Sequence, residues 1–284
     1  RVEDFPLEGL GGKIALMERG EVTFQEKVHN AQDAGASAAI IYNNEPGNFL
    51  GTLATESEIP ALSISQAEGR HLLGLLGQGE VVAEVKVIRQ NAPSQSVIAT
   101  KVGLGTEVVV IGAHYDTVAG VAGANDNASG TAVLLTLAQA LKDETFPFTL
   151  RLIAFGSEEV GLLGSRNYVR SILPDGAAGI RAMLNFDAVG SGDGLATGGD
   201  PELVDRALTA AREMGISISE EREPVGATSD HAVFDAAGIP IIYFTGTDLS
   251  RVHTGQDTSE FVEVNLLEDA VQLGLSLVRG LSQQ

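Results

Sequence analysis

The feature of this sequence that most constrains its fold is the alternation of short apolar runs with longer segments of helical periodicity. Runs such as 108–113 and 149–155 are rich in Val, Ile, Leu and Phe and are too short for buried helices, which favours strands. Segments such as 129–141 and 266–281 repeat apolar residues at spacings of three and four, which is typical of helices. This alternation predicts an α/β fold with a mixed, mostly parallel central sheet sandwiched by helices.

The alternation occurs in two segments of the 284-residue chain, separated by the polar, breaker-rich stretch 90–94. We therefore predict a smaller α/β domain over 1–93 and a larger domain over 94–284. The expected strands of the smaller domain are 13–18, 37–42, 59–64 and 81–88. The expected elements of the larger domain are strands 97–101, 108–113, 149–155, 182–186 and 239–244 and helices 129–141, 165–173, 201–214, 230–237 and 266–281.

One connection departs from the parallel pattern. The spacer 103–106 between the first two strands of the larger domain is short and contains two glycines. A parallel pair needs a long crossover connection, whereas a spacer of this kind favours a β-hairpin. The central sheet is therefore expected to be mixed.

The ends of the predicted strands carry imidazole and carboxylate side chains. Ligands of open α/β sheets bind beyond the carboxyl ends of the strands, so these side chains are expected to converge. Each is more often structural when it occurs alone, and only their joint placement indicates a site. In chain order they are His114, Asp116, Asp126 in the Gly- and Asn-rich loop 123–130, Glu158, Glu159, Asp187 and His253.

Carboxylates packed this closely would repel one another, and bound divalent cations would remove that repulsion. Histidine and carboxylate ligands without thiolates suit Zn²⁺, with Mn²⁺ or Co²⁺ as alternatives. The number of carboxylates favours two metal ions that share a bridging carboxylate. Asp116 is expected to orient the imidazole of His114, and of the adjacent Glu158 and Glu159 one can hold a metal while the other transfers a proton.

Composition and missing motifs exclude other classes of protein. Lys and Arg number 18 against 38 Asp and Glu, a net charge of −20, so nucleic acids and anionic membrane surfaces are not expected partners. No apolar run is long enough to span a membrane. The absence of cysteine excludes disulfides and thiolate sites, and no serine-hydrolase elbow, P-loop or dinucleotide-binding fingerprint is present.

The motifs around these residues resemble those of bizinc aminopeptidases of the bacterial leucine type. They are His114-Tyr115-Asp116, the loop 123–130, Ser157-Glu158-Glu159, Asn185-Phe186-Asp187, Ser229-Asp230-His231 and His253-Thr254. The family also contains the yeast vacuolar aminopeptidase, glutamate carboxypeptidase, glutaminyl cyclase and the transferrin receptor ectodomain. The resemblance covers residues 96–284 and implies a zinc exopeptidase-like domain over 94–284.

Segment 1–93 resembles the protease-associated (PA) domain that many members of this family carry. The matching positions are Gly12-Lys13-Ile14, Arg19-Gly20, Phe24, Lys27, Gly35-Ala36, Ile40-Ile41 and Ile59-Pro60. In the family a peptidase segment precedes this domain, and nothing here corresponds to it. We therefore expect the chain to start inside the PA domain, which would be truncated at its start.

Carried over residue by residue, the resemblance implies two zinc ions per chain. One would be held by His114, Asp126 and Asp187, and the other by Asp126, Glu159 and His253, with Asp126 bridging the two. It also implies that Glu158 is the general base and Asp116 the partner of His114, that the peptide bond after Asp126 is cis, and that the protein is secreted.

The activity that the resemblance implies is a zinc-dependent aminopeptidase acting on peptides with free N-termini. The alternatives are a metallocarboxypeptidase or dipeptidase, a single-zinc glutaminyl cyclase and a non-catalytic, receptor-like binding protein. Many relatives place Tyr immediately before the last histidine as an oxyanion donor, whereas this chain has Val252, and Tyr243 is a candidate substitute.

Overall fold

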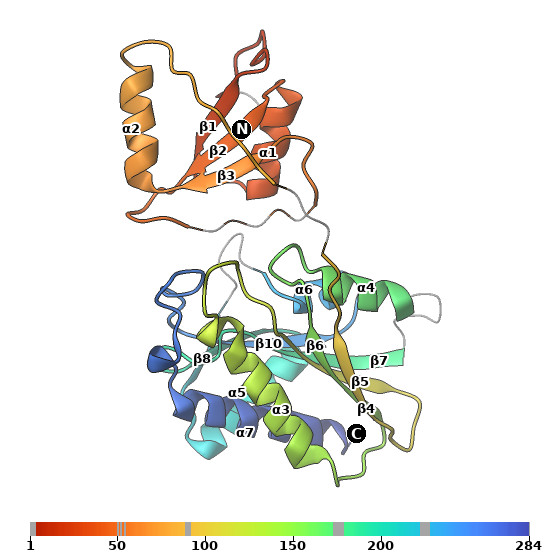
Figure 1. Ribbon diagram of the computed structural model, residues 1–284. Coiled ribbons are helices and arrows are strands. Elements are labelled where there is room, and N and C mark those ends of the chain that lie inside the picture. The colour runs from red at the N-terminus through yellow and green to blue at the C-terminus, as the bar shows by residue number, and fades with distance from the viewer. Residues whose placement is uncertain are drawn as a thin grey trace. The chain divides into compact units, whose positions relative to one another are not determined.

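The computed structural model describes residues 4–49, 51, 53, 55–88, 92–172, 179–221 and 228–283. The chain forms two compact units, Arg1–Pro93 and Ser94–Gln284 (Figure 1). Each unit has its own sheet and its own hydrophobic core.

The first unit is a three-stranded parallel sheet with two helices. The strands are in the order β1-β2-β3, and β2 is buried along its whole length. The elements are β1 (Ile14–Glu18), α1 (Phe24–Asp33), β2 (Ala38–Tyr42), β3 (Ala61–Ile64) and α2 (Gln66–Leu76). This is the smaller α/β fold that the alternation of the sequence predicts.

Local sequence signals explain where the two helices of this unit begin. The Thr23 side chain accepts a hydrogen bond from the amide of Glu26 at the start of α1. Ser65 and Glu68 form a capping box at the start of α2. Gly69 allows α2 to approach β2, because a Cβ at this position would overlap the Cβ and Cγ atoms of Tyr42.

The strand predicted over 81–88 is wrong, because these residues form neither strand nor helix. Their pattern alternates, but a strand also needs a neighbour that accepts and donates its main-chain hydrogen bonds. The described part of the first unit pairs no strand with this segment. Most of its apolar side chains are exposed to solvent, with Val82 93% and Ile88 86% exposed.

The second unit is built on a seven-stranded mixed sheet in the order β4-β6-β5-β7-β10-β8-β9. Strands β6, β5, β7 and β10 are adjacent and parallel, whereas β4 is antiparallel to β6 and β8 to β10. The strands are β4 (Val97–Lys101), β5 (Val108–His114), β6 (Thr149–Phe155), β7 (Ile180–Phe186), β8 (Leu195–Gly199), β9 (Ile218–Glu220) and β10 (Ile241–Gly246).

Helices cover both faces of this sheet (Figure 1), which confirms the predicted α/β architecture. One face packs against α3, α5 and α7 through residues such as Ile111, Phe186 and Phe244. The other face packs against α4 and α6 through Phe155 and Met183. The helices are α3 (Gly130–Leu141), α4 (Leu163–Ile172), α5 (Pro201–Met214), α6 (His231–Asp235) and α7 (Val264–Leu281). Position 173, the last residue of the helix predicted over 165–173, lies outside the described residues.

The predicted hairpin between β4 and β5 is wrong. Strand β6 lies between them, pairing antiparallel with β4 and parallel with β5. The spacer is short, but the amide of Leu104 donates a hydrogen bond to the main-chain oxygen of Phe146, which lies just before β6. The chain therefore turns around the end of β6 instead of folding directly back. Strands β8 and β9 are not predicted from the sequence, because one ends in Gly198-Gly199 and the other has only three residues.

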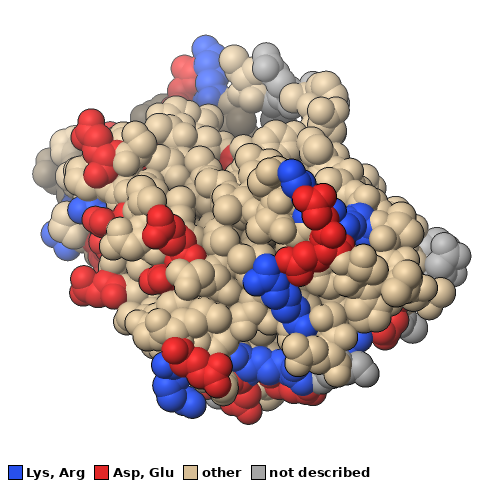
Figure 2. Space-filling model, turned by 90° about the horizontal axis from the view of Figure 1, so that it is seen from below, with Lys and Arg blue, Asp and Glu red and all other residues tan. Residues whose placement is uncertain are grey.

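The surface adds two observations. On the face shown in Figure 2, basic side chains lie among acidic ones, so the net charge of −20 is not gathered there into a single acidic patch. Among the helices that the structure describes, none combines the length and hydrophobicity required to cross a bilayer.

Candidate metal centre

The topology of the sheet brings all seven candidate residues to one edge. His114 is the last residue of β5, Asp187 follows β7, and the two glutamates follow β6. His253 lies in the loop between β10 and α7, and Asp126 in the irregular turn η2 (Ala124–Ser129) that leads into α3. Because β6, β5, β7 and β10 run parallel, the loops after them meet at the same end of the sheet.

The candidate ligands form two groups of three that share Asp126. His114, Asp126 and Asp187 form one group, and the Nε2 atom of His114 lies 3.0 Å from Asp126 Oδ1 and 3.1 Å from Asp187 Oδ1. Asp126, Glu159 and His253 form the other, and the Nε2 atom of His253 lies 3.0 Å from Asp126 Oδ2 and 2.9 Å from Glu159 Oε2. Asp126 therefore offers one carboxylate oxygen to each group.

The donor set of these groups fits zinc. Each group has one imidazole nitrogen and two carboxylate oxygens, and its ligand atoms lie within 4.8 Å of one another. Tetrahedral zinc bonds of about 2.0–2.1 Å place neighbouring ligand atoms about 3.3 Å apart. The separations of 2.9–3.1 Å are close to that value, so a small outward movement would accommodate an ion in each group.

The same contacts shift the pKa values of the two imidazoles and the shared carboxylate. Burial opposes a charge on His253, but hydrogen bonds to Asp126 and Glu159 outweigh it and raise its pKa to about 10. Burial likewise opposes a charge on His114, yet Asp187 and Asp126 hold its pKa well above the usual value. For Asp126, the two imidazoles outweigh the effect of burial and lower the pKa. The carboxylates thus stabilise positive charge at both imidazole positions, which is the electrostatic condition for binding cations.

Glu158 lies beside both of these ligand groups but belongs to neither. One of its carboxylate oxygens lies within 4.8 Å of ligand atoms of His114 and Glu159. Its side chain is buried, and this burial, with further contributions from Asp187 and Asp230, raises its pKa well above the usual value. A carboxyl group with a raised pKa next to a metal site is suited to accept and return a proton near neutral pH.

The position of Asp116 differs from the expected one. Its carboxylate lies 3.8 Å from Nδ1 of His114, too far for a hydrogen bond, and Nδ1 instead faces the main-chain oxygen of Asp116 at 3.0 Å. The carboxylate accepts hydrogen bonds from the amides of Glu158 (3.1 Å) and Glu159 (3.3 Å). Asp116 therefore orients the imidazole through its main chain and the two glutamates through its side chain.

Two asparagines beside the shared carboxylate were not predicted to belong to the site. The side chain of Asn125 accepts from the amide of Gly190 (2.7 Å) and donates to Ser191 Oγ (3.0 Å). The side chain of Asn127 accepts from the amides of Gly130 (2.8 Å) and Ala188 (3.2 Å) and donates to the oxygen of Phe186 (3.0 Å). They tie the Asp126 loop to the loop after β7. An Asn-Asp-Asn sequence is also typical of an ordinary turn, so the signal was present but ambiguous.

The backbone around the site adopts unusual conformations. The Asp126–Asn127 peptide bond is cis, as the resemblance implied. Ser157, Ala188 and His253 have φ angles of 59°, 51° and 60° without being glycine. Each lies at or next to a candidate site residue. Left-handed backbone at non-glycine residues costs free energy and is concentrated at functional sites, which agrees with a functional role for this edge of the sheet.

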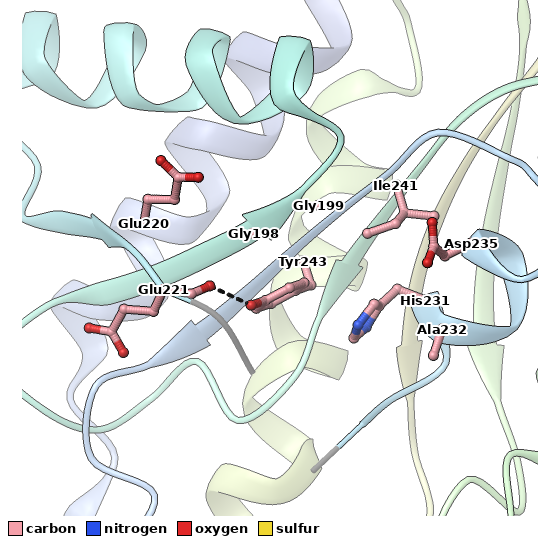
Figure 3. A pocket seen from close by; sticks show the side chains of 9 residues that line it. All are labelled: Gly198, Gly199, Glu220, Glu221, His231, Ala232, Asp235, Ile241 and Tyr243. Atoms are coloured by element: carbon pink, nitrogen blue, oxygen red, sulfur yellow. Dashed lines mark hydrogen bonds between the residues drawn. The ribbon is translucent and has the colours of Figure 1, made fainter. Parts of the chain in front are cut away.

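Tyr243, the candidate oxyanion donor, belongs to a different part of the unit. Its hydroxyl donates to the main-chain oxygen of Glu221 at 2.7 Å, and its ring stacks on His231 (Figure 3). Both side chains line a pocket of about 540 Å³ that also contains Glu220 and Asp235, and none of the candidate metal ligands is among its described lining residues. The hydroxyl proton of Tyr243 is therefore not directed at the metal centre.

Comparison with known proteins places these observations in a family. A sequence model of peptidase family M28 matches residues 96–278, and a model of the PA domain matches residues 2–72. The chain is 42% identical to leucine aminopeptidase 2 of Arthroderma otae over an alignment that covers 66% of this chain and 39% of that protein. It is 34% identical to aminopeptidase YwaD of Bacillus subtilis over an alignment that covers 92% of this chain and 61% of that protein.

The solved structures agree. BSAP, a zinc aminopeptidase from Bacillus subtilis, superposes with a TM-score of 0.78 at 30% identity, covering 99% of this chain and 72% of that chain. The chain spans about two fifths of the length of leucine aminopeptidase 2 and about three fifths of the length of YwaD. Because the M28 match extends over more than half of the sequence and includes every candidate ligand, the chain belongs to peptidase family M28.

Proposed function

We propose that this chain carries the catalytic site of a zinc-dependent aminopeptidase, which hydrolyses N-terminal residues from peptides. The observation that carries the proposal is the pair of ligand groups sharing Asp126, with the buried carboxyl group of Glu158 beside both. Membership of family M28 and similarity to a zinc aminopeptidase of Bacillus subtilis support it.

The proposal assigns a role to each part of the chain. Residues 94–284 are the zinc exopeptidase domain and residues 1–93 the PA domain. His114, Asp126 and Asp187 would hold one zinc ion, and Asp126, Glu159 and His253 the other. Zinc in such sites acts as a Lewis acid and lowers the pKa of water, so that hydroxide becomes available near neutral pH. The donor sets also suit Mn²⁺ or Co²⁺.

The chain's own residues handle the proton. Glu158 accepts a proton from the attacking water and delivers it to the nitrogen of the departing amine, so the peptide bond breaks and a free amino acid and a shortened peptide leave. Asp116 holds the amides of Glu158 and Glu159, which fixes where both glutamates lie relative to His114. The reaction consumes one water and leaves Glu158 in its starting state.

Electrostatics favour a substrate with a free N-terminus. The site is lined by carboxylates, among them Glu158 and the partly exposed Asp187, and an acidic site of this kind would attract the ammonium group of a free N-terminus. A carboxypeptidase would instead need a basic group for the substrate carboxylate. Four arginines lie near the motifs in the sequence, Arg151, Arg166, Arg170 and Arg251. Two of them are already engaged, since Arg151 donates to the hydroxyl of Tyr168 and Arg251 pairs with Asp248.

The test combines metal analysis with a substrate panel on the full chain. We expect two zinc ions per chain, hydrolysis of aminoacyl anilides, loss of activity with a chelator and recovery on addition of zinc. N-acetylated versions of the same substrates are the matched control and should not be cleaved. N-acetylated peptides with a free carboxyl end complete the panel, and release of their C-terminal amino acids would indicate a carboxypeptidase instead.

Other outcomes would favour the remaining alternatives. One zinc ion per chain together with cyclisation of N-terminal glutamine would indicate a glutaminyl cyclase. Metal binding without turnover of any substrate in the panel would indicate a receptor-like binding protein. An extracytoplasmic location is proposed from the resemblance alone, and detection of the protein in the medium of its native cells tests it.

A further inference from the structure

A buried aspartate outside both ligand groups holds the loop that carries the shared carboxylate. Asp257 is 2% exposed and lies four residues after His253. Its Oδ1 accepts a hydrogen bond from the amide of Asn125 at 2.6 Å, and its Oδ2 accepts one from the amide of Asp126 at 3.0 Å. Its main-chain oxygen also accepts from the amide of Ala124 at 3.4 Å. Asp257 thus binds three consecutive amides of η2.

Asp257 is itself fixed to the turn that carries His253. Its amide donates to the main-chain oxygen of Thr254 at 3.1 Å, and the amide of Thr254 donates to that of Arg251 at 3.1 Å. Two consecutive turns, 251–254 and 254–257, therefore contain one candidate ligand and the residue that holds the loop of another. The two segments that it joins are 132 residues apart in the sequence.

The chemistry of this contact needs a carboxylate. Two neighbouring amides point at Asp257, and a carboxylate offers an acceptor oxygen to each, whereas an amide side chain offers one oxygen and one donor group. Hydrogen bonds from amides to a carboxylate are stronger than those to a neutral acceptor. Asp257 therefore sets the position of the Asp126 main chain more firmly than a neutral side chain of the same shape could.

From this geometry we propose that Asp257 is a positioning residue that couples the two metal sites. Asp126 offers one oxygen to the His114 group and the other to the His253 group, each at 3.0 Å from the imidazole. A displaced Asp126 main chain would move both oxygens together, so loss of Asp257 should weaken metal binding in both groups. This inference rests on the proposed metal centre and assigns a function to a residue that binds neither metal nor substrate.

The test measures zinc affinity and not activity. The metal-free full chain of the parent and of Asp257→Asn is titrated with zinc against a chromophoric chelator, at a temperature where circular dichroism shows both to be folded. We expect the substitution to weaken both zinc affinities by about tenfold or more, in the range seen when residues that orient metal ligands are lost. Affinities within twofold of the parent would overturn the inference.

Asp200→Asn is the matched control. Asp200 also accepts hydrogen bonds from two amides, those of Glu202 (3.0 Å) and Leu203 (3.4 Å), but at the start of α5. We expect it to lower thermal stability while leaving zinc affinity within twofold of the parent. An equal loss of affinity in this control would contradict a specific role of Asp257, since it would show that affinity follows stability.

Three further outcomes are decisive. If Asp257→Asn does not fold, Asp257→Glu takes its place. The longer side chain displaces the carboxylate and should also weaken zinc binding at both sites, so unchanged zinc affinities would overturn the inference. A parent that binds two zinc ions but cleaves no aminoacyl substrate would contradict the proposed function alone, and the zinc comparison would still decide the role of Asp257. A parent that binds fewer than two zinc ions would overturn the coupling itself.

Discussion

Replacement of Asn127 by Ala is the perturbation whose cost follows most directly from the structure. The side chain is 1% exposed and makes three hydrogen bonds, all to main-chain groups. It accepts from the amides of Gly130 and Ala188 and donates to the oxygen of Phe186. Alanine removes all three bonds and leaves three main-chain groups without their partner in a region closed to solvent.

The expected loss can be worked out from these bonds. A hydrogen bond contributes about 0.5–1.5 kcal/mol net, and a buried group left unsatisfied costs about 1–3 kcal/mol. At about 1 kcal/mol for each bond, where the two ranges overlap, three bonds correspond to about 3 kcal/mol of the free energy of unfolding of the second unit. For a unit of this size, about 2–4 °C of melting temperature accompany each kcal/mol, so the melting temperature should fall by about 6–12 °C.

Differential scanning calorimetry of the chelator-treated protein measures this change without a contribution from bound metal. Unfolding enthalpy scales with residue number, so the larger transition belongs to Ser94–Gln284 and the smaller to Arg1–Pro93. We expect Asn127→Ala to lower only the larger transition. The control is Asn167→Ala, which removes an exposed asparagine from α4 and should change the stability by less than about 0.5 kcal/mol.

The reasoning would be refuted by a small effect. If Asn127→Ala lowered the larger transition no more than Asn167→Ala does, the three hydrogen bonds would contribute nothing net to stability. A fall confined to the smaller transition would show that the contacts of Asn127 do not belong to the second unit.

Three other changes have defined outcomes. Glu158→Gln should lower kcat on aminoacyl anilides by about 10²–10⁴-fold with unchanged zinc content. The control, Glu213→Gln on the exposed face of α5, should leave kcat unchanged. An unchanged kcat of Glu158→Gln would exclude Glu158 as the base. Gly69→Ala should lower the free energy of unfolding of the first unit, measured by calorimetry, by about 1–3 kcal/mol, because the added methyl group would overlap β2. Gly74→Ala is the control: its methyl group would lie in open space and should stabilise α2 by up to about 1 kcal/mol. Equal effects of the two substitutions would contradict the overlap. In metal-free protein the contacts with Asp126 and Glu159 raise the pKa of His253 to about 10, so the protonated imidazole stabilises the fold. This contribution is complete below pH 6.5 and is lost as the pH rises through 10. The melting temperature of the parent should therefore fall more over this range than that of His253→Gln, and parallel curves would show that His253 does not contribute.

The sequence itself determined the architecture because that information is local. Apolar runs and helical periodicity reflect which side chains face a core, and each can be recognised within a window of ten to twenty residues. The same windows place polar residues such as His114 and Asp187 directly after strands. Once the strands are assumed to be parallel, those residues must meet at one edge, so the candidate ligands could be found before the fold was known.

Pairing partners were decided only by the tertiary structure. The spacer before β5 favours a hairpin, yet β6, a strand from farther along the chain, lies between β4 and β5 and pairs with both. Segment 81–88 alternates as a strand does, but a strand exists only when another strand satisfies its main chain. No local window contains the partner, so no local pattern can decide either case.

The residues that hold the ligands in place also became visible only in three dimensions. Asp116 was expected to face His114 because they are neighbours in sequence, but its carboxylate binds the amides of two residues 42 and 43 positions later. Asp257 gives no sequence signal at all, because its partners lie 131 and 132 residues earlier. Ligand identity depends on the chemistry of single side chains, which a sequence displays, whereas ligand position depends on contacts between distant segments, which exist only after the chain has folded.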